Sequence, residues 1–460
     1  MSEKITYQRG LKKRHVSLIA LGGIIGSSYF LGTGYILNQI GPYTFLAYAL
    51  GGLITYMTMA CLAELTLLDP THGSFISFSE KYLSKSIASG VGWSYWISWI
   101  VYIPSECVAG GILLHYFIPE ISVYIWASFL GAIVTVINLI HVKLFGEIEF
   151  WLAIVKIGLI VLFSILAIGI FFGLVGNEPT AIGGKYFFPE SGPFPHGIAI
   201  LFINMVILLS NFQGSEIIGL SAAESEHPEE TIPSALKKIS IRIVGLYLLP
   251  TFLVALIYPY QEANLSGSVF ALALEKYGLI KIGKAFSFFI IAGAISTANS
   301  GLYATIRSLH ALSEKSIAPS CLKKINRHGV PINATLFTLV TMWGMLLFSY
   351  FFSAHDFYAN LLAISGFTGS ICWIAICIAQ LKFRKVVTAD FLNLKKQFLQ
   401  VPFYPYFTYF SVALQIFCLL IVGLTPSLRS ALYLGIPAVC IPIIIEKYKN
   451  RFLSDKGTKK

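Results

Sequence analysis

Two polar segments interrupt long apolar runs and carry the backbone groups that could bind a ligand. The first, residues 21–30, contains Gly22, Gly23 and Gly26, and the second, residues 210–216, reads Ser-Asn-Phe-Gln-Gly-Ser-Glu. Glycine lets a backbone leave the helix or approach a bound molecule closely. Because unwound backbone in hydrocarbon must be satisfied by protein or by a water-lined cavity, such breaks indicate a site. Gly22 and Gly26 also have the spacing of close helix packing, but paired breaks in two halves of a chain favour a transporter site.

The two ends of a broken helix have opposite polarity. Free N–H groups at the start of the second half attract anions, and free carbonyls at the end of the first half attract cations. A pocket with both ends suits a zwitterion with an α-carboxylate and an α-ammonium. It needs no charged side chain, and an ion at bilayer depth costs at least ~2.5–3.5 kcal/mol. We expect donors from Gly26, Ser27 and Ser28, acceptor carbonyls from Ile24, Ser210 and Gln213, and Phe212 as a side wall, a lid or a plain packing aromatic.

Among the ionisable residues inside apolar runs, three are candidates for a functional role. Lys156 either extends to the cytoplasmic interface or is buried and exchanges the coupling proton. Glu106 follows Pro104, which can kink its helix, and Glu216 ends the second break. An acid that faces the pocket would favour a substrate with a second positive charge, whereas a protonated structural acid or one paired with Lys156 would not. The expected substrate-binding set is therefore Ile24, Gly26, Ser27, Ser28, Glu106, Ser210, Phe212, Gln213, Gly214 and Glu216.

The remaining motifs supply one candidate gating residue and argue against an enzyme. Glu224 lies near the inner end of the sixth run and is expected to be a gating residue or part of a solvated helix end. The sequence contains no paired-His motif, no nucleophile elbow and no phosphate loop. Its seven cysteines have no metal-ligand spacing. We expect no catalytic residue, no cofactor and no metal.

The composition is that of a multi-span membrane protein. Of 460 residues, 56% are hydrophobic and 12% are charged, about half the charged fraction of a soluble protein. Apolar runs long enough to cross a bilayer predict twelve membrane-spanning helices in an all-α fold. They lie near 16–38, 43–68, 87–117, 122–142, 149–173, 197–222, 241–259, 285–312, 332–353, 357–380, 404–424 and 430–446.

The charge pattern predicts the orientation. With twelve spans, 27 of the 33 Lys and Arg residues fall on the side of the termini and five on the other side. Such a bias places both termini in the cytoplasm. It also explains the net charge of +11 without a nucleic-acid partner. We expect residues 1–15 to be a basic cytoplasmic lead, residues 16–446 one transporter domain, and residues 447–460 a polar cytoplasmic tail.

Several motifs resemble bacterial amino acid permeases of the amino acid–polyamine–organocation superfamily, lysine-type and aromatic-type permeases above all. They occur in the family's order. They are Lys12-Lys13-Arg14-His15 before residues 19–26, Gly41-Pro42, Gly73-Ser74-Phe75, Gly92-Trp93-Ser94-Tyr95-Trp96, residues 145–151, residues 212–216, residues 224–228, Asn299-Ser300-Gly301-Leu302-Tyr303-Ala304 and Gly329-Val330-Pro331. The family commonly has Gly-Thr-Gly where this chain has Gly26-Ser27-Ser28, which narrows the room for a substrate carboxylate unless the Ser28 hydroxyl takes part.

The resemblance implies the leucine-transporter fold. Two inverted five-helix repeats (about 16–173 and 197–380) would be followed by two added helices (about 404–446). It also implies uptake of an amino acid across the cytoplasmic membrane by alternating access, usually with a proton. A cationic amino acid such as lysine is the first choice of substrate. A neutral or aromatic amino acid or γ-aminobutyrate, an exchanger, and a membrane sensor or channel are the alternatives. The sequence leaves the oligomeric state open.

Overall fold

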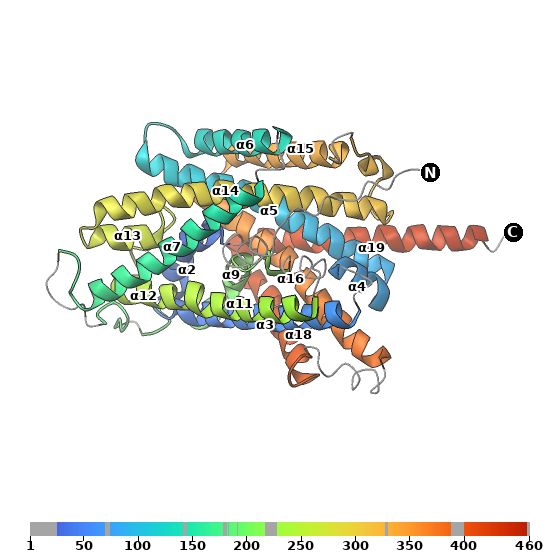
Figure 1. The fold of residues 1–460 in the computed structure, drawn as a ribbon, viewed down its shortest axis with the longest axis horizontal. Helices are drawn as coiled ribbons and strands as arrows, with labels where there is room; N and C mark the ends of the chain where they lie inside the picture. The colour runs from blue at the N-terminus through green and yellow to red at the C-terminus, as the bar shows by residue number, and fades with distance from the viewer. Residues whose placement is uncertain are drawn as a thin grey trace.

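In the computed structural model the chain is a bundle of α-helices that run roughly along one axis (Figure 1). The structure describes residues 25–69, 74–140, 145–177, 182, 184–190, 192–216, 228–326, 330–387 and 400–457. Helices suit an apolar chain because every backbone N–H and C=O can be satisfied within the segment. The helices are α2 (Ser27–Ile40), α3 (Thr44–Leu68), α4 (Phe75–Tyr82), α5 (Lys85–Phe117), α6 (Val123–Ile140), α7 (Phe145–Phe171), α8 (Ala199–Ile203), α9 (Met205–Ser210), α11 (Pro228–Arg242), η3 (Ile243–Leu248), α12 (Leu249–Ile257), α13 (Val269–Lys276), α14 (Ile280–Glu314), η4 (Ser320–Lys323), α15 (Ile332–Phe348), η5 (Ser349–Phe351), α16 (Ala354–Val386), α18 (Tyr406–Ile421), η6 (Val422–Leu424), η7 (Pro426–Leu428) and α19 (Arg429–Gly457).

Nine helices in the described part of the chain are long and apolar enough to cross a membrane. Helix α6 contains a shorter apolar stretch, Val123–Asn138. Of the described residues, the first predicted run overlaps α2 and the sixth contains α8 and α9. An all-helical membrane protein is thereby confirmed, and the count of twelve spans stays a prediction.

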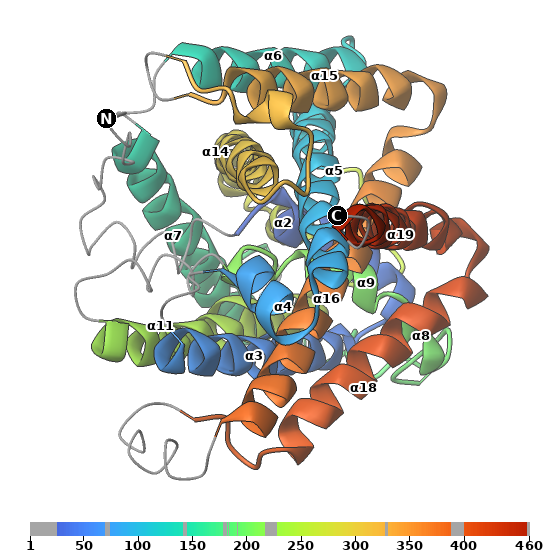
Figure 2. The same cartoon turned by 90° about the vertical axis from the view of Figure 1, so that its right-hand side faces the viewer.

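Helix α5 lies at the centre of the bundle. It packs against α14, α16, α6 and α19, and Figure 2 shows it between α14 and α19. In α5 and α16, 89% and 83% of the most apolar stretch is buried, against 22% in the last span, Pro426–Lys449. The outer helices therefore present their apolar side chains to lipid, and α5 can carry polar groups into the interior.

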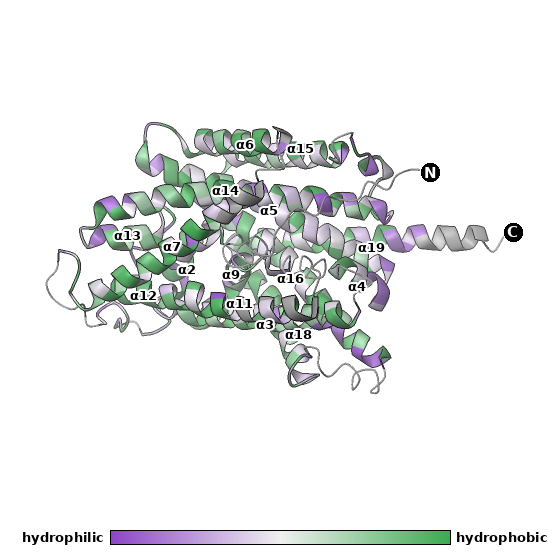
Figure 3. Ribbon diagram, viewed as in Figure 1, coloured by the Kyte–Doolittle hydropathy of each residue, from purple (hydrophilic) through white to green (hydrophobic). Residues whose placement is uncertain are grey.

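Two of the segments that connect the spans form short helices. Helix α4 buries Phe75 and Phe78 against the bundle, and its N-cap Ser74 accepts a hydrogen bond from the Ser77 amide. Helix α13 is buried against α14. Hydrophilic residues gather at α4 and at the segment of α19 that precedes its grey end (Figure 3).

Two helices differ from their predicted bounds. Helix α19 continues to Gly457, past the predicted end of the last span at 446. The seventh span begins at Ile232 instead of 241. Arg242 lies inside the predicted and the observed span, and it is fully buried.

Candidate functional site

The first candidate segment ends where α2 begins. Gly26 is the N-cap of α2 in an extended conformation (φ −95°, ψ −177°), and no side chain of its own caps the helix. The Ser27 amide donates instead to Oε2 of Glu106, at 3.0 Å. A Cβ at Gly26 would overlap the Glu106 carboxylate and the Tyr102 hydroxyl. The absence of a side chain at Gly26 is therefore what allows the carboxylate to reach the helix end.

Helix α5 supplies the groups that face this helix end. Pro104 lies inside α5, and the Ser105 hydroxyl donates to the Tyr102 carbonyl at 2.7 Å. The Tyr102 hydroxyl is 2.7 Å from the hydroxyl oxygen of Ser28. Glu106 is 1% exposed. The sequence expectation that Pro104 precedes an inward-facing acid agrees with this geometry.

Three buried polar atoms near the start of α2 have no hydrogen-bond partner among the described residues. They are Glu106 Oε1, Ser27 Oγ and the Tyr358 hydroxyl. The Tyr358 hydroxyl approaches α2 at Gly32, lying 3.8 Å from where a Cβ would stand. Buried polar groups are nearly always paired, so this group of atoms has the capacity to bind a polar ligand.

The second candidate segment is a true interruption. Helix α9 ends at Ser210 and residues 211–214 form turns, with Gly214 at φ +87°, a conformation that favours glycine. The Gly214 amide lies 3.1 Å from both carboxylate oxygens of Glu216. The Trp373 indole also donates to Glu216, at 3.3 Å. Glu216 thus satisfies the backbone of the break in which it lies.

Glu216 also has a cationic neighbour that sequence reasoning missed. The charge of Arg242 acts on Glu216, and the Arg242 guanidinium donates to the Ser215 hydroxyl. Arg242 lies 5.9 Å from the Tyr247 ring centroid. These contacts favour the alternative in which Glu216 is a structural acid, and the charge that acts on it is that of Arg242.

The side chain of Gln213 connects the second break to two helices. Its amide nitrogen donates to the Ser365 carbonyl at 2.6 Å, and its oxygen accepts from the hydroxyls of Ser98 and Ser365 at 3.2 and 2.8 Å. The backbone amide of Gln213 donates to the Ser210 carbonyl at 3.3 Å. The break is therefore tied to α5 and α16 by hydrogen bonds.

Phe212 lies in a buried aromatic cluster. Its ring is 4.7 Å from that of Tyr247 and 6.3 Å from that of Tyr48, centroid to centroid. The Tyr48 hydroxyl accepts from the Asn211 side chain at 2.8 Å. Phe212 is 0% exposed, which fits the packing alternative best and still allows it to form a wall.

Lys156 reaches the first break through a short chain of hydroxyls. It is 1% exposed, so its ammonium does not extend to water. It donates to Ser296 Oγ at 3.3 Å and Thr297 Oγ1 at 3.4 Å. Thr297 Oγ1 lies 3.0 Å from the Gly293 carbonyl and 3.5 Å from the Ile25 carbonyl, and its one proton can go to either. The charge of Lys156 acts on Glu106 as well. Lys156, the two hydroxyls and the Ile25 carbonyl thus lie close to one another.

The two segments are brought together, since α2 packs against both α9 and α5. Ile24 and Glu224 lie outside the described residues. Sequence reasoning also overlooked Tyr102, Tyr358, Trp373 and Ser365. Their only signal was a polar atom within an apolar run, which many packing residues share. The described residues contain no group of three or more acids, histidines or cysteines that could hold a metal.

Comparison with known proteins decides the family. Residues 15–457 match the amino acid permease family. The chain belongs to this family. As an amino acid permease it is a multi-span membrane transporter of amino acids and not an enzyme, as the motifs predicted.

Relatives of this permease cover nearly its whole length. It is 35% identical over 442 residues to the amino-acid permease RocE of Bacillus subtilis (strain 168), covering 95% of this chain and 94% of RocE. It is 34% identical over 442 residues to the amino-acid permease RocC of the same strain, covering 95% of this chain and 94% of RocC. It is 32% identical over 462 residues to the lysine-specific permease LysP of Lactococcus lactis subsp. cremoris (strain MG1363), covering 96% and 90%.

A solved transporter shares the fold. The structure aligns with the Eremococcus coleocola manganese transporter, with a TM-score of 0.56 and 11% sequence identity, over 94% of this chain and 92% of that one. At this identity the likeness concerns the fold alone.

Proposed function

We propose that this permease imports an amino acid together with a proton, and that its substrate is a cationic amino acid such as lysine. The observation that carries the proposal is the hydrogen bond from the Ser27 amide to the Glu106 carboxylate, 3.0 Å long. This bond supports a carboxylate site at the start of α2, where the positive end of the helix dipole lies. A substrate carboxylate would bind there, at Gly26, Ser27 and Ser28.

The ammonium would bind at the carbonyl ends of the two broken segments, at Ile24, Ser210 and Gln213. Gly214 would give this backbone its turn, and Phe212 would form the side wall. These roles are supported by the packing of α2 on α9 and by the turn that follows Ser210.

A second positive charge on the substrate is favoured by Glu106. One oxygen of this buried carboxylate has no hydrogen-bond partner in the described structure, and leaving a buried carboxylate half-paired is costly. Glu216 contributes less to this preference, because its oxygens already accept from Gly214 and Trp373. Neutral or aromatic amino acids and γ-aminobutyrate are the alternatives. Relatives include a putative histidine permease and a γ-aminobutyric acid permease of Bacillus subtilis (strain 168).

Lys156 is the proposed coupling residue. Its contacts with Ser296 and Thr297 connect it to the Ile25 carbonyl, so a change in its charge would act on the backbone that holds the substrate. A buried lysine exchanges its proton more readily than an exposed one, because burial disfavours the charged form. Glu224, near the inner mouth, is kept as a proposed gating residue.

The proposed architecture has twelve spans with both termini in the cytoplasm of a bacterial cell. Residues 16–446 would form one transport domain of two inverted five-helix repeats and two added helices, between a basic lead (1–15) and a cytoplasmic tail (447–460). Single cysteines introduced at Ser2 and at Ser266, between the seventh and eighth spans, should be labelled by a membrane-impermeant reagent from opposite sides. Labelling of both from one side would refute the topology.

Uptake into proteoliposomes tests the function. Labelled lysine should accumulate against its gradient when the outside is acidic, and excess unlabelled lysine or arginine should compete better than the neutral amino acids. A one-proton symporter driven by a gradient of 2 pH units can concentrate its substrate about 100-fold, since each unit is worth 1.36 kcal/mol. Lysine exchange without any response to the pH gradient would identify an exchanger instead. Conductance without saturable counterflow would identify a channel.

A further inference from the structure

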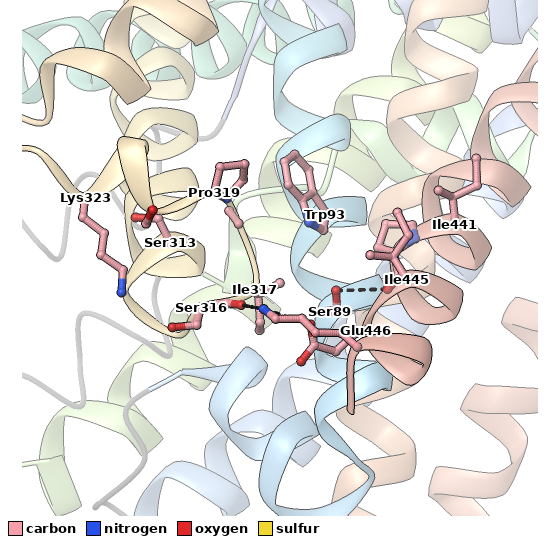
Figure 4. Close-up of a pocket in the computed structure, with 14 residues that line it drawn as sticks. Ser89, Trp93, Ser313, Ser316, Ile317, Pro319, Lys323, Ile441, Ile445 and Glu446 are labelled. Carbon is pink, nitrogen blue, oxygen red and sulfur yellow. Dashed lines mark hydrogen bonds and ion pairs between the residues drawn. The ribbon is translucent and has the colours of Figure 1, made fainter. Parts of the chain in front are cut away.

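A cavity of about 610 Å³ opens between four elements, far in sequence from the broken segments. It lies between the N-terminal part of α5, the end of α14, η4 and α19 (Figure 4). Its walls are apolar at Trp93, Ile317, Ala318, Ile441 and Ile445. Its charged lining residues are Lys323, Glu446 and Lys449. The cavity therefore has an apolar part and a charged part.

Helix α19 provides a track from the apolar to the basic part. Ile441, Ile445 and Lys449 are spaced four apart and so share one face of the helix. Ile441 and Ile445 are 54% and 60% exposed, on a span whose outer face is mostly open to lipid. An acyl chain could follow the two isoleucines and end beside an ammonium group.

The charges at the basic part do not cancel. Glu446 is buried and pairs with Lys85 at 3.3 Å and with Lys449 at 3.9 Å. Lys449 also donates to the Ser316 carbonyl at 2.7 Å, which joins α19 to the end of α14. Lys323 forms no ion pair with an acid of the described residues. Three lysines against one carboxylate leave a positive site.

We propose that this cavity binds one anionic phospholipid, with the phosphate between Lys323 and Lys449 and an acyl chain along Ile441 and Ile445. Basic cavities between spans on the cytoplasmic side suit anionic head groups, and the pair with Lys85 offsets the charge of Glu446. The bound lipid connects α14 to α19. The site is separate from the proposed amino acid site and does not depend on it.

Native mass spectrometry of the full-length protein tests the site, after reconstitution with phosphatidylglycerol or with phosphatidylcholine. The test variant is Lys323→Gln/Lys449→Gln. The matched control is Lys281→Gln/Lys284→Gln, which removes the same charge from exposed positions at the other end of α14. A lysine near an anionic membrane surface contributes about a fivefold change in affinity, so losing two predicts a roughly 30-fold loss.

The expected result is one retained phosphatidylglycerol on the unmodified protein and on the control, and its loss from the test variant. The melting temperature should rise with the phosphatidylglycerol fraction in the same two proteins only. Equal retention by both variants, or equal loss from both, would overturn the proposal. The proposal would also fail if phosphatidylcholine were retained as well as phosphatidylglycerol. If inorganic phosphate in neutral lipid raised the melting temperature by the same amount as phosphatidylglycerol, the cavity would be a site for a free anion instead.

Discussion

A methyl group added at Gly26 would occupy the space in which the Glu106 carboxylate reaches the start of α2. A Cβ there overlaps both Glu106 and the Tyr102 hydroxyl, and neither can withdraw without breaking a hydrogen bond. Glu106 would lose the Ser27 amide, 3.0 Å away, and Tyr102 would lose Ser28, 2.7 Å away. Gly26→Ala therefore changes the proposed carboxylate site without changing any charge.

The size of the effect follows from the bond that is lost. A hydrogen bond to a charged group contributes about 1.5–3 kcal/mol, and every 1.4 kcal/mol is a factor of ten in binding. A substrate carboxylate bound at the same amide would lose a similar amount. We therefore expect KM for lysine uptake by Gly26→Ala to rise roughly 10- to 100-fold.

Gly32→Ala is the matched control on the same helix. A Cβ at Gly32 lies 3.5 Å from Leu362 Cδ1, an ordinary contact, and alanine favours a helix interior over glycine by about 0.5–1 kcal/mol. Both variants are reconstituted at equal density, and initial uptake rates are measured against lysine concentration. The reasoning is refuted if Gly26→Ala keeps the KM of the unmodified protein, or if Gly32→Ala raises KM equally.

Three further changes have expected outcomes. Lys156→Gln should abolish accumulation driven by a pH gradient while lysine counterflow persists; full pH-driven accumulation in this variant would rule out Lys156 as the coupling residue. Arg384→Gln should destabilise the protein by about 3–5 kcal/mol, because it leaves the buried Glu64 without its bidentate partner at 2.6 and 2.7 Å. Thermal unfolding is the assay, and the exposed Lys385→Gln is the control that should show no such loss. Equal losses of stability in the two variants would disprove the argument. Gln213→Leu should lower the melting temperature, because it removes the hydrogen bonds to Ser98 and Ser365. The two serine hydroxyls and the Ser365 carbonyl would then need other hydrogen-bond partners. An unchanged melting temperature would contradict the role of Gln213 in tying the break to α5 and α16.

Much of the fold could be predicted from one-dimensional features. Long apolar runs predict helices because a bilayer leaves few other ways to satisfy the backbone. The bounds agree closely for α5, expected at 87–117 and observed at Lys85–Phe117. The end of α19 was harder to predict, because the residues beyond 446 no longer form an apolar run. The helix nevertheless continues to Gly457.

The candidate site was predictable only in part. Glycine-containing breaks at 21–30 and 210–216 are visible in the sequence, because an interrupted apolar run is a local property. The partner of each acid is not local. Glu106 meets an amide 79 positions away in the chain, and Glu216 accepts from the Trp373 indole, 157 positions away.

The sequence by itself determined that this chain is a helical membrane protein with two polar breaks, because composition and spacing act within each segment. The family resemblance, carried by short motifs, was confirmed by the match over residues 15–457. Only the tertiary structure decided which groups meet. Glu106 at the start of α2, Gln213 between α5 and α16, and Lys156 beside Thr297 are each placed by helix packing. Packing depends on all helices at once, so no single segment encodes these contacts.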